Sequence, residues 1–371
     1  MKILQLGKFY PVRGGVEKVM YDIMQGVSDR GICCDMLCAA NEDLESGVRQ
    51  LNPCARLLCV PVWKKLAATM ISPAMIRKLF QIKHEYDIIH IHHPDPMACL
   101  ALFLSGYKGK VVLHWHSDIL KQKVLLRLYK PFQSWMIRRA DLILGTTPVY
   151  VRESPFLKNV QHKTDFVPIG IEPVVTMSSS MDVIRQKHAG RKIVFSLGRL
   201  VEYKGYEYLI RAAQYLSDEY LILIGGVGPL RGQLASLVET LDVGKKVELI
   251  GFVKDEDLPA YYGACHLFCL SSIWKTEAFA IVQIEAMSCG KPVVSTHIPG
   301  SGVSWVNAHD ESGLVVPAED ERALADAITS MLQDGGEYHR LAEGALNRYR
   351  TLFTGEKMVD KCLGIYTKLL G

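Results

Sequence analysis

No hydrophobic run in this sequence is long enough to cross a membrane. The longest uninterrupted apolar segment, Met97 to Leu104, has eight residues, whereas a membrane-spanning helix needs about 18 or more. The chain begins directly with a strand-like segment, MKILQLG, which has neither the hydrophobic core nor the cleavage site of a signal peptide. We therefore expect a cytoplasmic protein.

The cysteines lack the arrangement of a disulfide framework. There are ten of them in 371 residues, and two, Cys33 and Cys34, are adjacent. Disulfide frameworks are typical of short secreted chains with spaced cysteines. We expect buried free thiols in a reducing compartment, which again favours the cytoplasm.

Common nucleotide- and nucleic-acid-binding signatures are missing as well. GGVGP (225–229) does not continue as G-x-G-x-x-G, because the third residue after Gly228 is Arg231. CGKP (289–292) is not a P-loop, because proline follows Lys291. No basic run is continuous and no RNA- or DNA-binding motif is present, so we expect no nucleic-acid partner.

Acidic residues are missing from two basic stretches in the first half of the chain. Residues 1–170 hold 23 lysines and arginines against 14 acids, whereas residues 171–371 hold 20 against 25. The excess lies in Trp63 to Lys83, with five bases, and in Ile119 to Arg139, with six. Both stretches also contain large apolar residues. They predict surface helices that are either solvated or in contact with anionic lipid or an anionic lipid-linked acceptor.

What the chain does contain is a regular alternation of strand-like and helix-like segments. Its composition, 49% hydrophobic and 22% charged, is that of a globular protein, and its length allows two domains. The alternation predicts α/β domains of the Rossmann-like, doubly wound type, with parallel sheets covered on both faces. VPIGIEPVVTMSSSMD (167–182) combines Pro, Gly and Ser and predicts a linker between domains at residues 1–170 and 171–354.

The segment EAFAIVQIE, from Glu277 to Glu285, is the most informative in the sequence. At about 100° per residue the two carboxylates cannot share a helical face, so Glu277 lies on the entering loop and Glu285 on the second turn. The free N–H groups of Phe279, Ala280 and Ile281 give the helix a positive N-terminus that suits a phosphate. This layout fits a nucleotide-sugar, in which a diphosphate joins two sugars. The alternative is a first-turn acid followed by a solvated helix residue.

Two further loops follow predicted strands. SLGRLVEYKGYEYLI (196–210) predicts a strand end, a loop with Arg199 and Lys204, and a new helix. A planar guanidinium and a lysine charge suit a diphosphate, and open α/β sheets bind ligands at the carboxyl ends of their strands. Gly14 and Gly15 precede the first helix, where two glycines either let the backbone approach a bound group or form an ordinary loop.

Histidines gather at the ends of two predicted strands. His90, His92 and His93 end one strand, His114 and His116 end the other, and Asp95 and Asp118 follow closely. Period-two spacing puts alternate histidines on a common face. One interpretation is a His/carboxylate metal site. The other is the ordinary collection of polar residues at adjacent strand ends.

The order of these motifs resembles that of the retaining glycosyltransferases of family 4. The landmarks run KFYPVRGGVEKV (8–19), HWHSDILKQK (114–123), VPIGIEP (167–173), GRLVEYKG (198–205), IGGVGPLR (224–231), GFVKDEDLPAYY (251–262) and EAFAIVQIEAMSCGKPVVST (277–296). They cover nearly the whole chain. The resemblance implies the GT-B fold, in which two Rossmann-like domains face a cleft and a last helix, here about residues 355–371, crosses back onto the first domain.

The resemblance also implies a role for each site residue. It places Arg199, Lys204 and the amides of Phe279, Ala280 and Ile281 on the donor diphosphate, Gly14 and Gly15 against the donor phosphates, Glu285 on the ribose, Glu277 and His116 on the transferred sugar, Phe252 and Val253 beside the nucleobase, and Asp118 and Lys121 near the acceptor. In such enzymes positive side chains do the work of a divalent metal. We therefore expect no metal ion and no cofactor besides the donor substrate.

Two departures from the family pattern bear on the subgroup. The family usually has glycine where Ala280 stands, and it often continues G-G-x-x-E where this chain has IPGSGVSWVN (298–307). The second variant, together with WHSDILKQK, resembles bacterial mannosyl- and rhamnosyltransferases of surface-polysaccharide assembly.

We expect a retaining hexosyltransferase that moves mannose from GDP-mannose, or another hexose from a UDP-sugar, onto a glycan or lipid-linked glycan. A sugar-nucleotide epimerase of the same architecture and a non-catalytic nucleotide-sugar-binding protein stay open as alternatives. The basic stretches argue against the epimerase, and the four charged site residues argue against the binding protein. The same stretches predict peripheral contact between this cytoplasmic protein and an anionic membrane.

Overall fold

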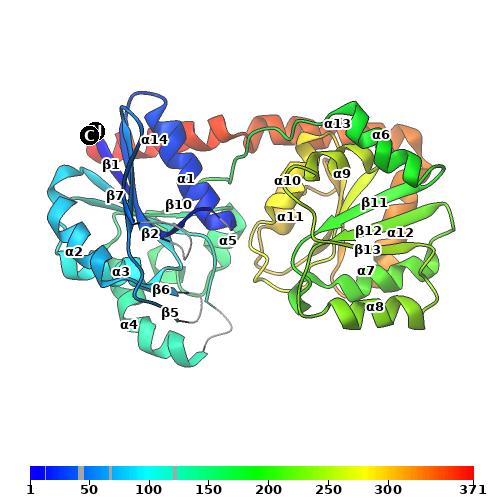
Figure 1. Ribbon diagram of the computed structural model, residues 1–371, viewed down its shortest axis with the longest axis horizontal. Helices are drawn as coiled ribbons and strands as arrows, with labels where there is room; N and C mark the ends of the chain where they lie inside the picture. Colours follow the sequence, from blue (N-terminus) through cyan, green and yellow to red (C-terminus); the bar gives the residue numbers. More distant parts are fainter. Residues whose placement is uncertain (13, 41–45, 67–68, 120–122) are drawn as a thin grey trace. The chain divides into compact units, whose positions relative to one another are not determined.

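The computed structural model describes residues 1–371 apart from residues 13, 41–45, 67–68 and 120–122; the side chains of residues 66, 123–126 and 128 are likewise not described. Over the described ranges the chain forms two compact units, residues 1–170 with 355–371 and residues 171–354. Each unit is a sheet with helices packed on it (Figure 1). None of the helices in these ranges is long and apolar enough to cross a bilayer.

The first unit is built on a mostly parallel sheet. Counting described residues only, the sheet has eight strands in the order β10-β9-β8-β7-β1-β2-β4-β3, and only β3 is antiparallel to its neighbour. The elements are β1 (Lys2–Tyr10), α1 (Gly15–Ser28), β2 (Cys33–Ala40), β3 (Gly47–Asn52), β4 (Ala55–Val60), β5 (Lys64–Leu66), β6 (Thr69–Ile71), α2 (Pro73–Ile82), β7 (Ile88–His93), α3 (Pro96–Ser105), β8 (Lys110–Trp115), α4 (Lys123–Arg139), β9 (Leu142–Gly145), α5 (Pro148–Glu153), β10 (Thr164–Phe166) and α14 (Gly355–Leu370).

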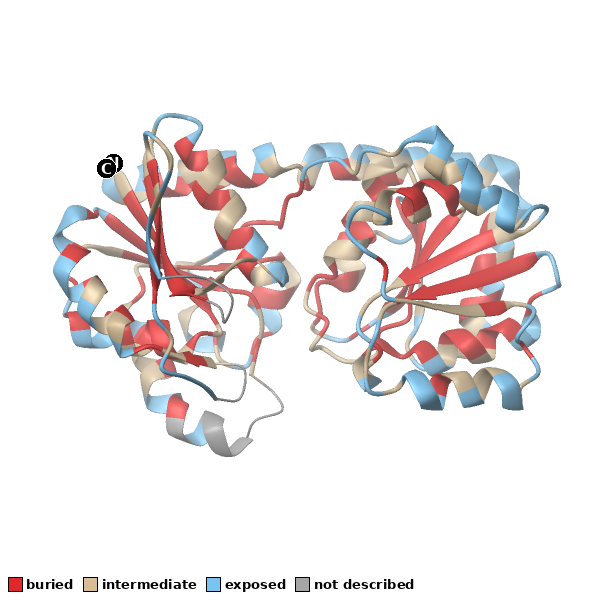
Figure 2. Ribbon diagram, in the orientation of Figure 1, coloured by how far each residue is buried: buried red, intermediate tan, exposed pale blue. Residues whose placement is uncertain are grey.

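Helices cover both faces of this sheet. Helices α2, α3 and α4 form one layer, and α1 and α14 pack together on the other face. Every residue of β7 is buried, its histidines included. Figure 2 shows buried strands between helices whose outer faces are exposed. Parallel strands that are buried on both faces have near-continuous apolar sequences, and this explains why the strands could be predicted from composition.

The C-terminal helix α14 is fixed to the first unit by close packing. A Cβ atom at Gly26 of α1 would lie 2.4 Å from Cγ2 of Val359, so the two helices approach where only glycine fits. Arg30 Nη2 donates to Asp360 Oδ1 at 2.7 Å. The helix therefore belongs to the first unit, although it follows the second in sequence.

The prediction of two basic surface helices is partly wrong. Lys64 and Lys65 lie in β5, which pairs with β6 in a two-stranded antiparallel hairpin. The helix of this stretch begins only at Pro73, because proline is favoured at the first position of a helix and disfavoured inside one. The second stretch does form a helix, α4. Lys121, a predicted acceptor residue, lies outside the described residues.

The second unit is built on a parallel sheet. Across the described residues this sheet has six strands in the order β13-β12-β11-β14-β15-β16. The elements are α6 (Ser178–Lys187), β11 (Lys192–Leu197), η3 (Glu202–Lys204), α7 (Tyr206–Ala212), β12 (Tyr220–Gly225), α8 (Arg231–Thr240), β13 (Val247–Gly251), α9 (Leu258–Ala264), β14 (Leu267–Leu270), α10 (Ile281–Ser288), β15 (Val293–His297), α11 (Val303–Val306), β16 (Gly313–Pro317), α12 (Glu321–Gln333) and α13 (Gly335–Leu352).

The predicted linker at residues 167–182 is too long. Helix α6 begins at Ser178, so the extended part ends at Met177. Serine favours both turns and helix starts, and composition alone did not separate the two. At the edge of the second unit the two crossing segments lie side by side, because Ile171 forms a parallel bridge with Thr354.

The strand order reverses once beside the first strand of each unit. The reversal lies between β1 and β7 in the first unit and between β11 and β14 in the second. At such switch points the connections leave in opposite directions, and open α/β sheets bind ligands at the carboxyl ends of the strands there. The predicted site residues Gly14, Lys204 and Glu277 all lie on loops that follow these strands.

Candidate active site

The loops after β11 and β14 meet at the switch point of the second unit. Lys204 ends the short turn η3 after β11, and Glu277 lies between β14 and α10. Their side chains form a buried ion pair, in which Lys204 Nζ is 2.5 Å from Glu277 Oε2. Ser272 Oγ donates to the same carboxylate oxygen at 3.0 Å. The structure thus joins two residues for which the sequence predicted separate ligand groups.

The ion pair keeps Lys204 protonated. Burial alone would lower the pKa of this amine, but the negative charge of Glu277, with a smaller contribution from Tyr203, outweighs burial and raises the pKa. A charged amine is therefore held in place at the carboxyl end of the sheet before any ligand binds. Such preorganisation is what electrostatic stabilisation of a leaving group requires.

The turn after Lys204 requires glycine. Gly205 has φ +60°, and a Cβ atom there would lie 2.2 Å from the carbonyl oxygen of Ser271. Ser271 Oγ in turn donates to the carbonyl of Lys204 at 3.0 Å. This close approach ties the loop after β11 to the loop after β14. Arg199 lies on the first of these loops with an exposed side chain, so its guanidinium is accessible to a ligand.

Helix α10 begins at a residue in the left-handed region. Ala280 is its N-cap, with φ +62° and ψ +79°, a conformation that strains a residue with a Cβ atom. Within the described ranges, the amides of Phe279, Ala280 and Ile281 donate to no protein group. These three N–H groups are therefore available to an anion at the positive end of the helix.

Ala280→Gly should stabilise the protein. The left-handed region costs an L-residue about 1–2 kcal/mol, and the greater freedom of glycine in the unfolded chain offsets part of that gain. We expect a net increase of about 1 kcal/mol in the free energy of unfolding, measured by urea denaturation. Ala286→Gly, the same substitution inside α10, is the matched control and should destabilise by about 1 kcal/mol or more. Equal losses in the two variants would contradict strain at Ala280.

Glu285 lies on the second turn of α10, and one of its oxygens is already engaged. The hydroxyl of Tyr262, from α9, donates to Glu285 Oε2 at 2.5 Å. Burial, together with the charge of Glu285, raises the pKa of Tyr262 well above its usual value, so this hydroxyl keeps its proton. Glu285 is half-buried. The alternative of a freely solvated helix residue is therefore wrong.

The two residues predicted beside the nucleobase differ in exposure. Phe252, just after β13, is 71% exposed, whereas Val253 is buried. Val253 Cγ2 lies 3.0 Å from where a Cβ atom of Gly225 would be, at the end of β12. Val253 thus anchors the segment to the sheet edge, and the ring of Phe252 is left accessible.

Gly14 is the N-cap of α1 and has extended backbone angles, φ −144° and ψ 170°. A Cβ atom there would lie 2.5 Å from Glu17 Oε2, and the Glu17 side chain is buried. A larger residue here would require the Glu17 side chain to move, whereas the backbone angles alone would accept one. Gly15, the first residue of α1, is exposed like Gly14.

Four buried histidines stack on one face of the first sheet, and we call them the histidine ladder. His90 and His92 belong to β7, His114 belongs to β8, and His116 follows the end of β8. Ring centroids of neighbours lie 4.1 Å apart for His114 and His116 and 4.7 Å apart for His90 and His92. Burial lowers the pKa of all four rings below the usual value. The imidazoles are therefore neutral.

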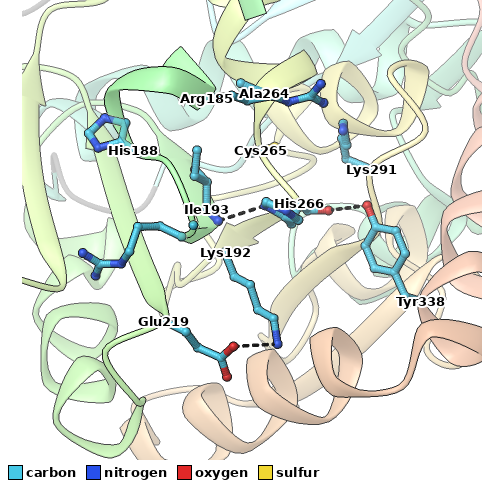
Figure 3. Close-up of a pocket in the computed structure, with 12 residues that line it drawn as sticks. Arg185, His188, Lys192, Ile193, Glu219, Ala264, Cys265, His266, Lys291 and Tyr338 are labelled. Atoms are coloured by element: carbon cyan, nitrogen blue, oxygen red, sulfur yellow. Dashed lines mark hydrogen bonds and ion pairs between the residues drawn. The ribbon is translucent and has the colours of Figure 1, made fainter. Parts of the chain in front are cut away.

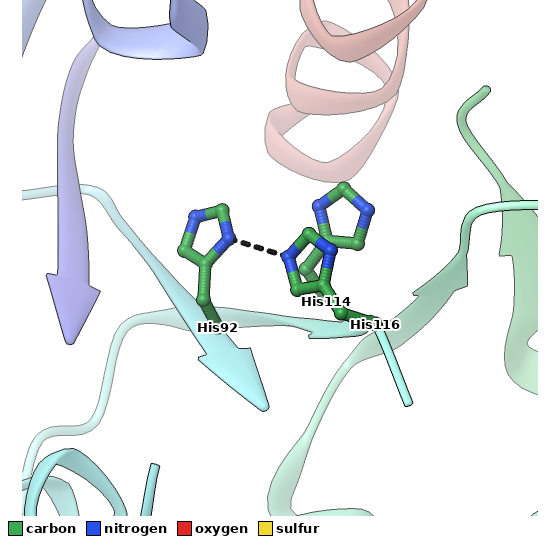
Figure 4. A group of neighbouring side chains, drawn as sticks. All are labelled: His92, His114 and His116. Atoms are coloured by element: carbon green, nitrogen blue, oxygen red, sulfur yellow. Dashed lines mark hydrogen bonds between the residues drawn. The ribbon is translucent and has the colours of Figure 1, made fainter. Parts of the chain in front are cut away.

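The ladder brings three rings close enough to consider a metal ion. The candidate ligand atoms of His92, His114 and His116 lie within 4.8 Å of one another (Figure 4). However, His92 Nδ1 and His116 Nε2 already share a hydrogen bond of 2.9 Å, and the ring of His114 is stacked on that of His116 at an interplanar angle of 15°. A metal bond lies in the plane of an imidazole, and two stacked rings cannot direct lone pairs to one ion. These orientations do not fit a shared metal.

The carboxylates predicted near the histidines have other partners. Asp95 Oδ1 accepts from the N–H of Ala98 at 3.0 Å as the N-cap of α3, and its Oδ2 accepts from the N–H of Lys8 at 2.5 Å. Asp118 Oδ1 accepts from Trp115 Nε1 and from Ser154 Oγ, both at 2.8 Å. These contacts argue against the alternative interpretation of a mixed His/carboxylate metal site, and they hold the loops after β7 and β8.

Two pockets lie away from the switch points. One, of about 440 Å³, opens at the amino ends of β11 and β14 and is rich in basic side chains (Figure 3). Lys192 there is 3.0 Å from Glu219, and Arg191 Nη2 donates to two backbone carbonyls. The other, of about 470 Å³, lies at the amino ends of β7 and β8. Neither includes a residue of the candidate site, and Arg191 and Lys192 of the first pocket are engaged in holding the fold.

The residues that position the predicted ones were not predicted from the sequence. Ser272 bonds Glu277, Tyr262 bonds Glu285, and Gln5 bonds the histidine ladder through His92. Only Gln5 had a local signal, because it is a polar residue in the middle of the apolar strand KILQLG. The other two contacts join elements whose approach depends on the fold.

Family models match both units of the chain. Residues 13–173 match the model of Glycosyltransferase Family 4, and residues 180–348 match that of Glycosyl transferases group 1. The O-antigen chain mannosyltransferase C of Escherichia coli is 31% identical over 373 residues, which cover 100% of this chain and 99% of that protein. The D-rhamnosyltransferase WbpZ of Pseudomonas aeruginosa is 29% identical, over 95% of this chain and 92% of that protein.

Solved structures share the fold over the whole chain. HepE of Anabaena, in complex with UDP-glucose, has a TM-score of 0.76 and 22% identity, covering 99% of this chain and 100% of that one. Sucrose-phosphate synthase from Thermosynechococcus elongatus has a TM-score of 0.79 and 20% identity, covering 100% of this chain and 99% of that one. The predicted fold, two parallel-sheet α/β domains of the GT-B type, is confirmed.

Proposed function

This chain belongs to the glycosyltransferases of family 4, and we propose that it is a retaining, metal-independent hexosyltransferase that uses a nucleotide-sugar. Its relatives make it a glycosyltransferase of polysaccharide biosynthesis. The observation that carries the finer proposal is the charged amine of Lys204, which is held by Glu277 on the loop that leads into the free amides of α10. Lys204 and these amides fit a diphosphate on one side and a sugar on the other.

In the proposed reaction the diphosphate leaves from the face on which the acceptor hydroxyl attacks. The bond between the anomeric carbon and the diphosphate oxygen breaks, the bond to the acceptor oxygen forms, and the acceptor proton passes to the leaving oxygen. Lys204, Arg199 and the amides of α10 stabilise the negative charge that develops on the diphosphate. Glu277 and His116 orient the transferred sugar. No dedicated protein base is needed.

The donor we favour is GDP-mannose. A mannosyltransferase and a rhamnosyltransferase are among the relatives that cover nearly the whole chain, which supports a hexose of the mannose type. A UDP-sugar is the second candidate, because the structurally similar HepE was solved with UDP-glucose. The acceptor we propose is a glycan or a lipid-linked glycan.

The test is release of free nucleoside diphosphate from a panel of nucleotide-sugars, with and without a glycan acceptor and with excess EDTA. We expect acceptor-dependent release of GDP from GDP-mannose that persists in EDTA. An epimerase would convert the donor sugar and leave the nucleotide attached, and a binding protein would do neither. Loss of activity in EDTA with rescue by a divalent ion would contradict the metal-independent mechanism.

Glu277 and Glu285 should differ in their kinetic roles. Glu285→Ala should raise the donor KM more than it lowers kcat, because ribose contacts hold the ground state and the transition state alike. Glu277→Ala should mainly lower kcat, because it removes the partner of Lys204 and a contact to the reacting sugar. Steady-state kinetics with varied donor concentration checks this.

Tyr262→Phe, which removes only the hydroxyl that holds Glu285, should reproduce a weaker form of the Glu285→Ala effect. The same pattern in Glu277→Ala and Glu285→Ala would remove the separate assignments.

We also propose that the first unit meets an anionic membrane through the hairpin β5–β6 and helix α2. Trp63 is 79% exposed and Phe80 is 58% exposed, and the side chains of Lys64, Lys65 and Arg77 are exposed as well. Exposed aromatic rings next to basic side chains fit a lipid–water interface. Lys83 is not part of this surface, because it is buried and its ammonium donates to the carbonyl of Ser105.

Binding to anionic liposomes should therefore be sensitive to salt. Each basic residue near the surface contributes about 1 kcal/mol, and the attraction decays within about 10 Å at 0.1 M salt. Changing Lys64, Lys65, Arg77 and Lys78 to glutamate should release the protein from the liposomes in a sedimentation assay. Donor binding should stay unchanged, because Arg199 and Lys204 lie in the other unit. Reversal of Lys245 and Lys254, which lie in the second unit, is the control. No sedimentation of the unmodified protein even at low salt would point to a soluble acceptor.

A further inference from the structure

A chain of buried hydrogen bonds reaches His116 across three neighbouring strands. Gln5 of β1 contacts His92 of β7, with Gln5 Oε1 2.8 Å from His92 Nε2. His92 Nδ1 then lies 2.9 Å from Nε2 of His116, which follows β8. Gln5 and His92 are fully buried and His116 is 5% exposed. The chain is therefore shielded from bulk solvent.

The direction of each hydrogen bond follows from the chemistry of the atoms. An amide oxygen can only accept, so His92 Nε2 carries the proton that Gln5 Oε1 accepts. A neutral imidazole has one N–H, so His92 Nδ1 carries a lone pair and accepts from the Nε2–H of His116. His116 is neutral as well, which leaves the lone pair of this ring on Nδ1. Among the described residues, Nδ1 of His116 is buried without a hydrogen-bond partner.

We propose that Gln5, acting through His92, fixes the tautomer of His116 so that its Nδ1 presents a lone pair to the donor sugar. Gln5 and His92 are then positioning residues, and His116 alone touches the substrate. This inference rests on the proposed function, because it takes from there the contact between His116 and the transferred sugar. The assignment of Gln5 and His92 is independent of which hexose or base the donor carries.

The orientation of Gln5 is itself held from the C-terminal helix. Gln5 Nε2 donates to the hydroxyl of Tyr366 at 3.2 Å, and this hydroxyl donates to His90 Nδ1 at 2.6 Å. With the amide nitrogen engaged by Tyr366, the amide oxygen is directed to His92. Helix α14, far away in sequence, thereby decides which nitrogen of His116 is protonated.

The tautomer matters because charge develops on the sugar during glycosyl transfer. The transition state of such reactions resembles an oxocarbenium ion, with positive charge near the anomeric carbon. A lone pair on Nδ1 stabilises this charge and accepts a hydrogen bond from a sugar hydroxyl, whereas an N–H in the same place opposes it. The wrong tautomer should therefore slow the chemical step and leave donor binding nearly unchanged.

The test combines nitrogen-15 NMR of labelled histidine side chains with donor kinetics. NMR distinguishes the protonated ring nitrogen from the unprotonated one, and the spectrum of His116→Gln identifies the His116 signals. In the unmodified protein we expect the proton on Nε2 of His116. Gln5→Met keeps the volume of the side chain and removes its amide. It should give both tautomers of His116 and a kcat that is lower by about 10- to 100-fold, the range found when the hydrogen-bond partner that orients a metal-bound histidine is lost.

Gln133→Met is the matched control. Gln133 is equally buried, and its amide lies 3.3 Å from Nε2 of His93 on the other face of the same sheet. It should change neither the tautomer of His116 nor kcat. His92→Asn, whose amide oxygen can take the place of Nδ1, should keep the proton on His116 Nε2, whereas His92→Leu should not.

Two different results would overturn two different statements. A proton on Nδ1 of His116 in the unmodified protein, or equal losses of kcat in Gln5→Met and Gln133→Met, would overturn the role of Gln5. The NMR result needs no variant of Gln5 and so holds even if Gln5→Met does not fold. The expected tautomer together with full turnover in His116→Ala would instead overturn the contact between His116 and the donor sugar.

Discussion

Lys204→Ala should lower kcat by about 10²–10³-fold, and Arg199→Ala should lower it by a similar factor. Each substitution removes one positive group that is in place before the diphosphate leaves, and this range is typical for the loss of one such donor. Lys204 is the more deeply placed of the two, because its ammonium is buried and held by Glu277 at 2.5 Å. The measurement is the rate of nucleoside diphosphate release at saturating donor and acceptor.

Lys192→Ala is the matched control for Lys204→Ala. Lys192 lies at the amino end of β11, the strand that leads to Lys204, and its ammonium is also paired with a glutamate, Glu219, at 3.0 Å. Because it lies at the opposite edge of the sheet, its loss should leave kcat unchanged. Near-normal turnover in both Lys204→Ala and Arg199→Ala would remove the assignment of a diphosphate clamp.

Lys204→Ala and Arg199→Ala should differ in their free energy of unfolding, although we expect similar losses of kcat. Lys204→Ala leaves the buried carboxylate of Glu277 without its cation, and breaking a buried pair in this way costs about 3–5 kcal/mol. Arg199 is exposed, and its loss should change the free energy of unfolding by less than about 0.5 kcal/mol. Assays must therefore run well below the melting midpoint of Lys204→Ala, and Arg199→Ala gives the cleaner kinetic result.

The strands and the two-unit architecture could be predicted because their signals are local. Buried parallel strands such as KIVFSL and YLILIG are apolar throughout, and they alternate with helical segments in sequence. The short hairpin β5–β6 could not be predicted, because its strands have three residues each and no alternation of apolar and polar residues. The antiparallel edge strand β3, GVRQLN, is likewise too polar to stand out.

The site residues could be proposed from motifs, but their mutual contacts could not. Lys204 and Glu277 are separated by 73 positions, and only the adjacency of β11 and β14 brings them together. The same holds for Gln5 and His92, because β1 pairs directly with β7 although other strands lie between them in sequence, and β7 in turn pairs with β8, which leads to His116. The strained geometry of Ala280 was signalled only by the departure from glycine in the family pattern.

The first unit should unfold cooperatively in mild acid. Five of its histidines are buried, namely the four of the ladder and His93. Burial, the largest cause in each case, lowers the pKa of all five, to about 3 for His93 and His114. In the unfolded chain their pKa is about 6.5. Between these values the unfolded chain binds protons that the folded unit does not.

The sign of the effect follows from this difference in bound protons. Above about pH 6.5 both states hold neutral histidines, and the stability is at its full value. As the pH falls below 6.5, each histidine lowers the free energy of unfolding by about 1.4 kcal/mol per pH unit, or about 7 kcal/mol for five. Ordinary domains are stable by about 5–15 kcal/mol. We therefore expect unfolding one to two units below 6.5, near pH 5.

Peptide-resolved hydrogen exchange between pH 7.5 and 4.5 provides the measurement, since it should show the first unit losing protection before the second. His114→Leu is the most informative variant, because both ring nitrogens of His114 are without a partner in the described part of the chain. This substitution lowers by one the number of protons that the chain takes up on unfolding, and it breaks no hydrogen bond. Unfolding should therefore shift to lower pH. Tyr129→Phe, which changes a buried hydroxyl of the same unit and no histidine, should leave the pH of the transition unchanged. Full protection of the first unit at pH 4.5 would contradict the prediction that these histidines bind fewer protons in the folded unit than in the unfolded chain.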